Sequence, residues 1–199
     1  IISSGLSKWC GAGGWRLGTF AFPKELDWLK KAVAVAASET FTSVSAPIQY
    51  AAVVAFDGGP EIDEYLCHQS RILSALGKEV HTRLCKAGAK VRAPVGGFYV
   101  WIDLSDFQDQ FQAKGITSSP QLCEELLQAT GVAILPGASF ERPSSELTAR
   151  LAYVNFNGAA AIKASKQIPL SEPLSGNFLG THCGAVLEGI DAFCAWINS

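Results

Sequence analysis

Apolar residues spaced three and four positions apart predict several helices along this chain. Residues 23–36 and 48–56 show this spacing, and residues 61–86 form the longest amphipathic stretch, with leucine, isoleucine and valine on one face. Residues 185–197 close the chain with the same period. A further helix is predicted to begin at Ser119-Pro120 and to stop at Gly131.

Short apolar runs between these helices predict strands. Residues 1–4 fit the end of a buried parallel strand. Aromatic and β-branched residues are concentrated at 96–104, which favours a strand there. Three further strand candidates cover residues 15–22, 132–135 and 147–156. Residues 168–182 are rich in Pro, Ser and Gly and are expected to form a loop.

The character of the chain changes around its long helix. The segment before it is built of a glycine-rich loop and helices, whereas the segment after it holds most of the strand candidates. We therefore expect two domains, 1–62 and 63–199, with the boundary at or just inside the start of the long helix.

Composition narrows the possible functions by exclusion. Hydrophobic residues make up 48% and charged residues 17%, which indicates a core-rich globular protein. The net charge is −2 without a basic block, so a nucleic-acid partner is not expected. The apolar runs are too short to cross a bilayer, and no signal peptide or lipidation motif is visible, so we expect no membrane association.

The six cysteines contain no CxxC pair, and the three histidines are scattered without acidic neighbours. Because a metal site needs clustered ligands, no metal is expected. The cysteines are predicted to be free thiols of a reducing compartment, most of them filling the core, which favours a cytoplasmic protein.

The densest chemical signal lies between Ser3 and Gly18. Lys8 follows the first predicted strand, and Arg16 follows a glycine cluster eight residues later. A lysine that attacks an aldehyde has to be held on rigid backbone, partly desolvated, so that its amine is neutral part of the time. The planar guanidinium of an arginine suits a phosphate. A lysine after a strand is by itself usually a solvated surface residue, so the prediction depends on the joint pattern.

That joint pattern resembles the attachment motif for pyridoxal 5'-phosphate (PLP) in class I/II, fold type I, aminotransferases. The resemblance covers Ser4, Ser7, Lys8, the glycines at 13, 14 and 18, and Arg16. It implies that Lys8 forms the Schiff base with the cofactor and that Arg16 binds the cofactor phosphate. Many members of the family have a serine three residues before the lysine, where this chain has Gly5.

Two later segments resemble the same family in the same order. Residues 93–101 resemble a strand of its small domain near the substrate pocket, and residues 131–140 with 149–152 resemble its closing motif. The resemblance implies that Arg150 binds the α-carboxylate of the substrate. An arginine between apolar strand neighbours has a physical reason when an anion meets it. The alternative is a surface arginine on a half-exposed strand.

The resemblance implies an α/β fold, the C-terminal part of the PLP-dependent transferase fold. Residues 1–62 would be the remainder of the large PLP-binding domain, and residues 63–199 a small α+β domain. It also implies a homodimer that acts on an amino acid and a 2-oxo acid. The family's residues for the pyridine nitrogen and for ring stacking precede the lysine strand. Because the chain begins with Ile1 and contains no methionine, we expect a fragment or processed product. Since only seven residues precede Lys8, those family residues are not found here, and we expect this chain alone neither to bind PLP tightly nor to transaminate.

Three functions remain open from the sequence. The first is PLP-dependent transamination of an α-amino acid to a keto acid. The second is a PLP-dependent lyase or synthase on the same fold, and the third is a non-catalytic sensor domain of a transcription regulator. The hydroxyl-rich stretch 40–45 holds no arginine for a second carboxylate, which argues against one mode of aspartate recognition.

Overall fold

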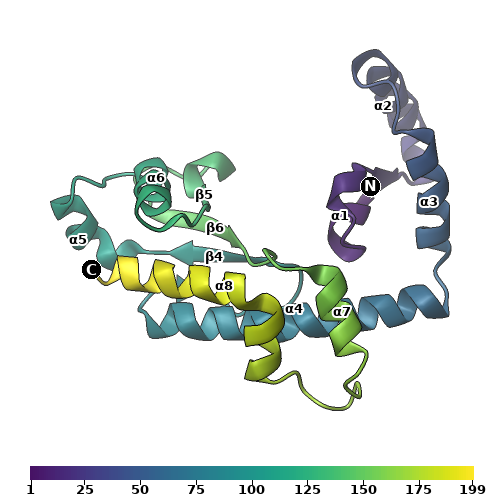
Figure 1. Cartoon of the computed structure of the whole chain (residues 1–199). Coiled ribbons are helices and arrows are strands. Elements are labelled where there is room, and N and C mark those ends of the chain that lie inside the picture. Colours follow the sequence, from purple (N-terminus) through teal and green to yellow (C-terminus); the bar gives the residue numbers. More distant parts are fainter. The chain divides into compact units, whose positions relative to one another are not determined.

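A computed structural model describes residues 1–199 and divides the chain into two compact units, Ile1–Cys67 and His68–Ser199. Helix α4 (Pro60–Lys86) begins in the first unit and continues into the second (Figure 1). The boundary expected between residues 62 and 63 falls in this same helix. Each unit has its own buried hydrophobic cluster.

The first unit opens with a two-stranded antiparallel sheet. Strand β1 (Ile2–Gly5) pairs with β2 (Gly18–Ala21), and the register runs from Ile2 opposite Ala21 to Gly5 opposite Gly18. The expectation of a buried parallel strand is therefore wrong for this chain. Within the chain β1 pairs with the strand that returns beside it, and its residues are exposed or half-buried.

Short helical turns join these two strands, and longer helices follow them. The turns are α1 (Leu6–Trp9) and the 3-10 turn η1 (Gly13–Trp15). After β2 come η2 (Lys24–Leu26), α2 (Asp27–Thr40) and α3 (Ala46–Asp57). The helix period of the sequence predicted α3 to within two residues at each end, whereas α2 begins and ends four residues later than predicted.

The buried cluster of the first unit is small. It consists of Leu6, Leu17, Ala52 and Ala55. Helix α2 buries none of its residues, and large apolar side chains such as Trp28 and Tyr50 are 66% and 78% exposed. Because α2 and α3 are rich in apolar residues yet little buried, their surface is unusually apolar for a protein exterior.

A four-stranded antiparallel sheet organises the second unit. Its order is β3-β4-β6-β5, and the strands are β3 (Lys90–Val91), β4 (Tyr99–Asp103), β6 (Thr148–Ala152) and β5 (Leu135–Pro136). The two central strands agree with the sequence prediction, whereas the regular part of β5 is only two residues long.

The two faces of this sheet differ in character, because successive side chains of a strand point to opposite sides. Val100 and Ile102 on β4, with Leu151 on β6, are buried in the core of the unit. The register places Trp101 opposite Arg150, so these two residues share the other face. The candidate binding residue Arg150 therefore lies on the face of the sheet that is turned away from the core.

Helices complete the second unit. They are α5 (Gln108–Ala113), α6 (Ser119–Thr130), α7 (Gly158–Ser165) and α8 (Gly176–Ile197), with 3-10 turns η3 (Ser105–Phe107) and η4 (Gly137–Phe140). Helix α6 has the predicted limits. None of the helices combines the length and the apolar character that crossing a membrane requires.

The start of α8 corrects the sequence analysis, which assigned residues 168–182 to a loop. The hydroxyl of Ser175 accepts a hydrogen bond from the amide of Phe178 at 3.2 Å and caps a helix that begins at Gly176. Cys183 has non-helical backbone angles, so the helix is kinked at this residue. Phe178 and Leu179 are buried, and this burial stabilises a turn whose glycines obscured its helical pattern.

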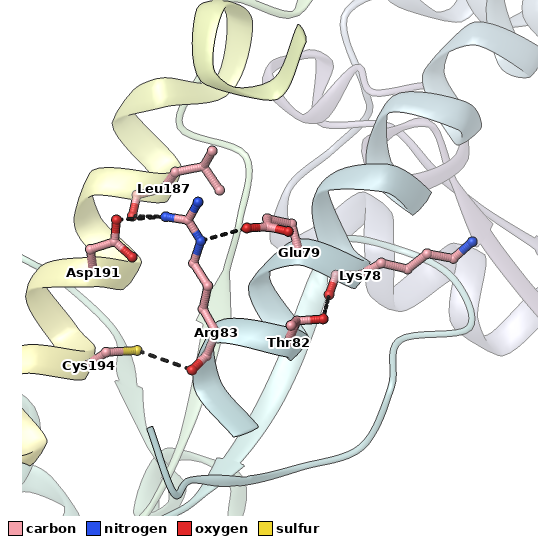
Figure 2. Close-up of polar contacts among 7 residues, drawn as sticks. All are labelled: Lys78, Glu79, Thr82, Arg83, Leu187, Asp191 and Cys194. Carbon is pink, nitrogen blue, oxygen red and sulfur yellow. Dashed lines mark hydrogen bonds and ion pairs between the residues drawn. The ribbon is translucent and has the colours of Figure 1, made fainter. Parts of the chain in front are cut away.

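Helices α4 and α8 are joined by Arg83, as Figure 2 shows. Its Nε donates to Glu79 at 2.8 Å, and its Nη1 donates to Asp191 of α8 at 2.7 Å. The hydrogen bond with Glu79, together with the attraction of Asp191, raises the pKa of Arg83. The Cys194 thiol donates to the Arg83 carbonyl, so the two helices are held at both backbone and side chain.

All six cysteines are free thiols, as predicted. The expectation that most of them fill the core is wrong, because burial differs from one to the next. Cys123 and Cys183 are buried, Cys10 and Cys194 are half-buried, and Cys67 and Cys85 are exposed.

Candidate functional site

Lys8 and Arg16 line one open pocket in the first unit, with a volume of about 540 Å³. This volume lies within the range of about 300–1,000 Å³ that is usual for small-molecule sites. The rest of the lining is formed by Ser3, Ser4, Gly5, Ser7, Trp9, Leu17 and Gly18. The structure thus brings together the two residues that the sequence pattern pairs, and no acidic side chain lines the pocket.

Lys8 lies on the helical turn α1, which is fixed by its buried neighbour Leu6. The amide of Leu6 donates to the carbonyl of Leu17 at 3.2 Å, and the carbonyl of Leu6 accepts from Ala12 at 2.9 Å. These bonds hold the turn against the loop and the return strand. Lys8 itself is exposed, whereas the sequence analysis predicted a partly desolvated lysine amine.

Arg16 has a left-handed backbone conformation, with φ of 53°, at the end of η1. Such angles are uncommon outside glycine and are often found at functional sites. Its Nη1 donates to the carbonyl of Gly13 at 2.9 Å. A guanidinium has five N–H donors, so this single bond fixes the side chain and leaves donors for an anion.

Gly5 stands where many family members have a serine, and the structure gives a steric reason. A β-carbon placed on Gly5 would lie 3.3 Å from the carbonyl oxygen of Leu17, which is tighter than an ordinary contact. Ser3, Ser4 and Ser7 are the serines that line the pocket.

Arg150 belongs to the second unit and lies on the face of its sheet that is turned away from the core. Its guanidinium carbon lies 4.3 Å from the centre of the Tyr99 ring and 4.6 Å from the centre of the Phe140 ring. It takes part in none of the ion pairs of the structure. A half-buried cation without a carboxylate partner is suited to bind an anion.

The remaining polar candidates have structural roles. Burial raises the pKa of the Cys10 thiol, which disfavours the nucleophilic thiolate, and its carbonyl accepts from Tyr65 at 2.8 Å. His68 is buried and lies 2.8 Å from the hydroxyl of Ser165, and His182 packs against Phe178.

Tyr99 and Phe140 lie in the two later segments that resemble the family, but nothing in the sequence alone connected either residue to Arg150. The two-residue period of β4 and the register with β6 put Tyr99 near Arg150 on one sheet face. That signal is visible in the sequence once the pairing is known. The contact between Phe140 and Arg150 has no such signal in the sequence. Phe140 lies in the 3-10 turn η4 and not in a paired strand, so no strand register predicts the contact.

The family model and the curated relatives that this chain matches are all aminotransferases. Residues 1–153 match the family described as Aminotransferase class I and II. The chain is 30% identical over 156 residues to an aspartate aminotransferase of Bacillus sp. strain YM-2, a match that covers 77% of this chain and 36% of that protein. It is 33% identical over 143 residues to an aspartate/prephenate aminotransferase of Cereibacter sphaeroides, covering 70% and 34%.

The fold is also similar to that of a solved structure, the aromatic aminotransferase from Pyrococcus horikoshii. The TM-score is 0.64 at 22% sequence identity, and the match covers 98% of this chain and 42% of that one. The chain therefore spans little more than a third of the length of the curated relatives it matches.

Proposed function

We propose that this chain, which belongs to the class I and II aminotransferase family, carries the cofactor lysine and the carboxylate-binding arginine of a PLP-dependent aminotransferase. The reaction is the conversion of an α-amino acid to a 2-oxo acid. The observation that carries the proposal is the pocket lined by both Lys8 and Arg16. The uncompensated cation of Arg150 supports it independently.

The groups in the pocket fit PLP, the cofactor of this family. An exposed amine suits its aldehyde, and a guanidinium with available donors suits its phosphate. Three serine hydroxyls add further donors, and no carboxylate lines the pocket to repel the phosphate. When bound, PLP supplies an electron sink for the charge that develops at the α-carbon of the substrate.

Each of the three residues has a distinct task. Lys8 would hold the cofactor through its side-chain amine, and the same amine would move the proton of the substrate α-carbon. Arg16 neutralises the phosphate and holds the cofactor in place. Arg150 binds the α-carboxylate of the substrate.

The homodimer implied by the family resemblance is part of the same proposal. The exposed apolar side chains on α2 and α3, among them Trp28 and Tyr50, support association of some kind. Light scattering on the purified protein measures the molar mass and tests this part separately.

The central test is selective labelling of Lys8. The purified protein is mixed with excess PLP, reduced with borohydride and analysed by peptide mass spectrometry. We expect the phosphopyridoxyl group mainly on Lys8, with loss of that label in Lys8→Ala and weaker labelling in Arg16→Ala. Lys30→Ala removes an exposed lysine of α2 in the same unit and serves as the matched control.

Equal labelling of Lys8 and Lys30 would show that the pocket has no affinity for PLP and would refute the proposal. Because this chain spans little more than a third of the length of its relatives and is expected not to transaminate alone, product analysis with an added amino acid on the complete enzyme separates the reaction classes. Transamination yields a 2-oxo acid together with the amine form of the cofactor, whereas a lyase releases no amine form.

A further inference from the structure

We infer that Tyr99 and Phe140 are positioning residues for Arg150, whose guanidinium they hold so that its N–H groups select a planar carboxylate. The inference deepens the proposed function and rests on it only in taking Arg150 as the residue that binds the substrate α-carboxylate. Its ligand class is a singly charged planar oxyanion, in preference to a pyramidal one of equal charge.

The two rings come from different elements and meet the same cation. Tyr99 is the first residue of β4, and Phe140 is the last residue of η4. The guanidinium carbon lies over both rings, at 4.3 Å and 4.6 Å from their centres. A cation over an aromatic face is attracted by the electron-rich π system, so both contacts restrain the guanidinium.

The Phe140 ring is itself held in place. Trp101 packs against it edge-on, with ring centres 5.5 Å apart and an interplanar angle of 81°. Trp101 is also the residue directly opposite Arg150 in the sheet. The backbone of η4 lies close against β6, since a β-carbon on Gly137 would overlap the hydroxyl of Thr148. Phe140 is thus fixed from its own backbone and from the neighbouring strand.

Ring contacts occupy the faces of a guanidinium and leave its in-plane N–H groups for hydrogen bonds. Arg150 takes part in no ion pair, so these donors are not matched by a carboxylate of the chain. A carboxylate lies in the same plane and accepts two parallel hydrogen bonds, which a pyramidal sulfonate matches less well. Lysine offers a point charge without a plane and would lose this geometry.

The test follows the Nε–Hε resonance of Arg150 by NMR in the full chain, assigned by its absence in Arg150→Lys. Sodium propionate and sodium methanesulfonate are titrated separately at constant ionic strength. We expect a restrained Nε–Hε group and propionate affinity higher by about threefold or more, as bidentate geometry favours.

Matched variants distinguish the effect of removing an aromatic ring from the effect of any other change at the same position. Phe140→Leu and Tyr99→Leu remove a ring, whereas Phe140→Tyr and Tyr99→Phe keep it. The ring-removing variants are expected to mobilise the Nε–Hε group and to weaken propionate binding by about three- to tenfold, the scale of one lost cation–π contact. Leu135→Ala alters the other strand neighbour of Arg150 and is expected to change neither signal.

The inference is overturned if Arg150 is equally mobile with and without the rings, or if the two anions bind with equal affinity. Amide spectra report whether each leucine variant is folded, and the other leucine variant decides the question if one is not. The outcome is independent of the Lys8 test, because neither anion is a cofactor. If PLP does not label Lys8 but Arg150 is restrained and prefers the carboxylate, the proposed function is rejected and the inference about Tyr99 and Phe140 stands.

Discussion

Gly77 of helix α4 lies directly against the hydroxyl of Tyr153. A β-carbon on Gly77 would be 2.9 Å from that oxygen and 3.0 Å from Cγ of Pro94. Tyr153 is 1% exposed, and its hydroxyl donates to the carbonyl of Gly97 at 3.2 Å. The glycine therefore allows α4 to approach the segment that leads into β4, the strand that carries Tyr99.

Gly77→Ala is expected to destabilise the protein by about 1–3 kcal/mol, because overpacking at this contact outweighs the higher helix propensity of alanine. Chemical denaturation measures the change. The same substitution at Gly180, an exposed position of α8 with open space around it, should instead stabilise by a few tenths to about 1 kcal/mol. A stabilising Gly77→Ala would show that the contact with Tyr153 relaxes at no cost.

Asp191→Asn removes one of the two carboxylates that bind Arg83 (Figure 2). Because the pair is partly exposed, the expected loss is about 0.5–1 kcal/mol at low salt. Screening should shrink the difference as the salt concentration rises. Glu188→Gln, which neutralises an exposed carboxylate of the same helix, is the control and should have little effect. A loss that does not respond to salt contradicts an electrostatic origin.

Stability is expected to fall in alkaline solution because of buried thiols. Burial raises the pKa of Cys183, like that of Cys123, from 9.0 to about 11. Between these values the unfolded chain has lost the proton and the folded chain has kept it, so the free energy of unfolding decreases as pH rises. The contribution is fully present below pH 9 and is lost as pH rises through about 11.

Cys183→Ala should reduce this alkaline loss by about 2–3 kcal/mol relative to the unsubstituted protein, since the shift is about two units and each unit corresponds to about 1.4 kcal/mol. The measurement is the free energy of unfolding as a function of pH. Cys85→Ala, at an exposed thiol, should leave the pH profile unchanged. Identical profiles for both variants would mean that the folded core tolerates the Cys183 thiolate.

Helix α6 ends at Gly131, which has φ of 74° and no neighbouring atoms that a β-carbon would meet. Gly131→Ala is therefore a test of backbone conformation alone. We expect a loss of about 1 kcal/mol, and a smaller loss for Gly131→Asn, because asparagine tolerates the left-handed region better. Thermal and chemical unfolding measure both variants, and equal losses would argue against a conformational cause.

The sequence by itself determined the elements whose signal is local. Helical spacing predicted α4 and α6, and the enrichment in aromatic and β-branched residues predicted β4. The order of Lys8, the glycines and Arg16 carried the family resemblance. These features depend on neighbours a few residues apart, so the chain encodes them without reference to its path in space.

The tertiary structure alone decided which distant residues meet. The antiparallel pairing of β1, the exposure of Lys8 and the contact of Phe140 with Arg150 depend on how loops return the chain. The helical start of α8 depends on burial of Phe178 and Leu179 by residues far away in sequence. Hydrophobic periodicity gives each element its buried side, but the partner that covers that side is chosen only when the whole chain packs.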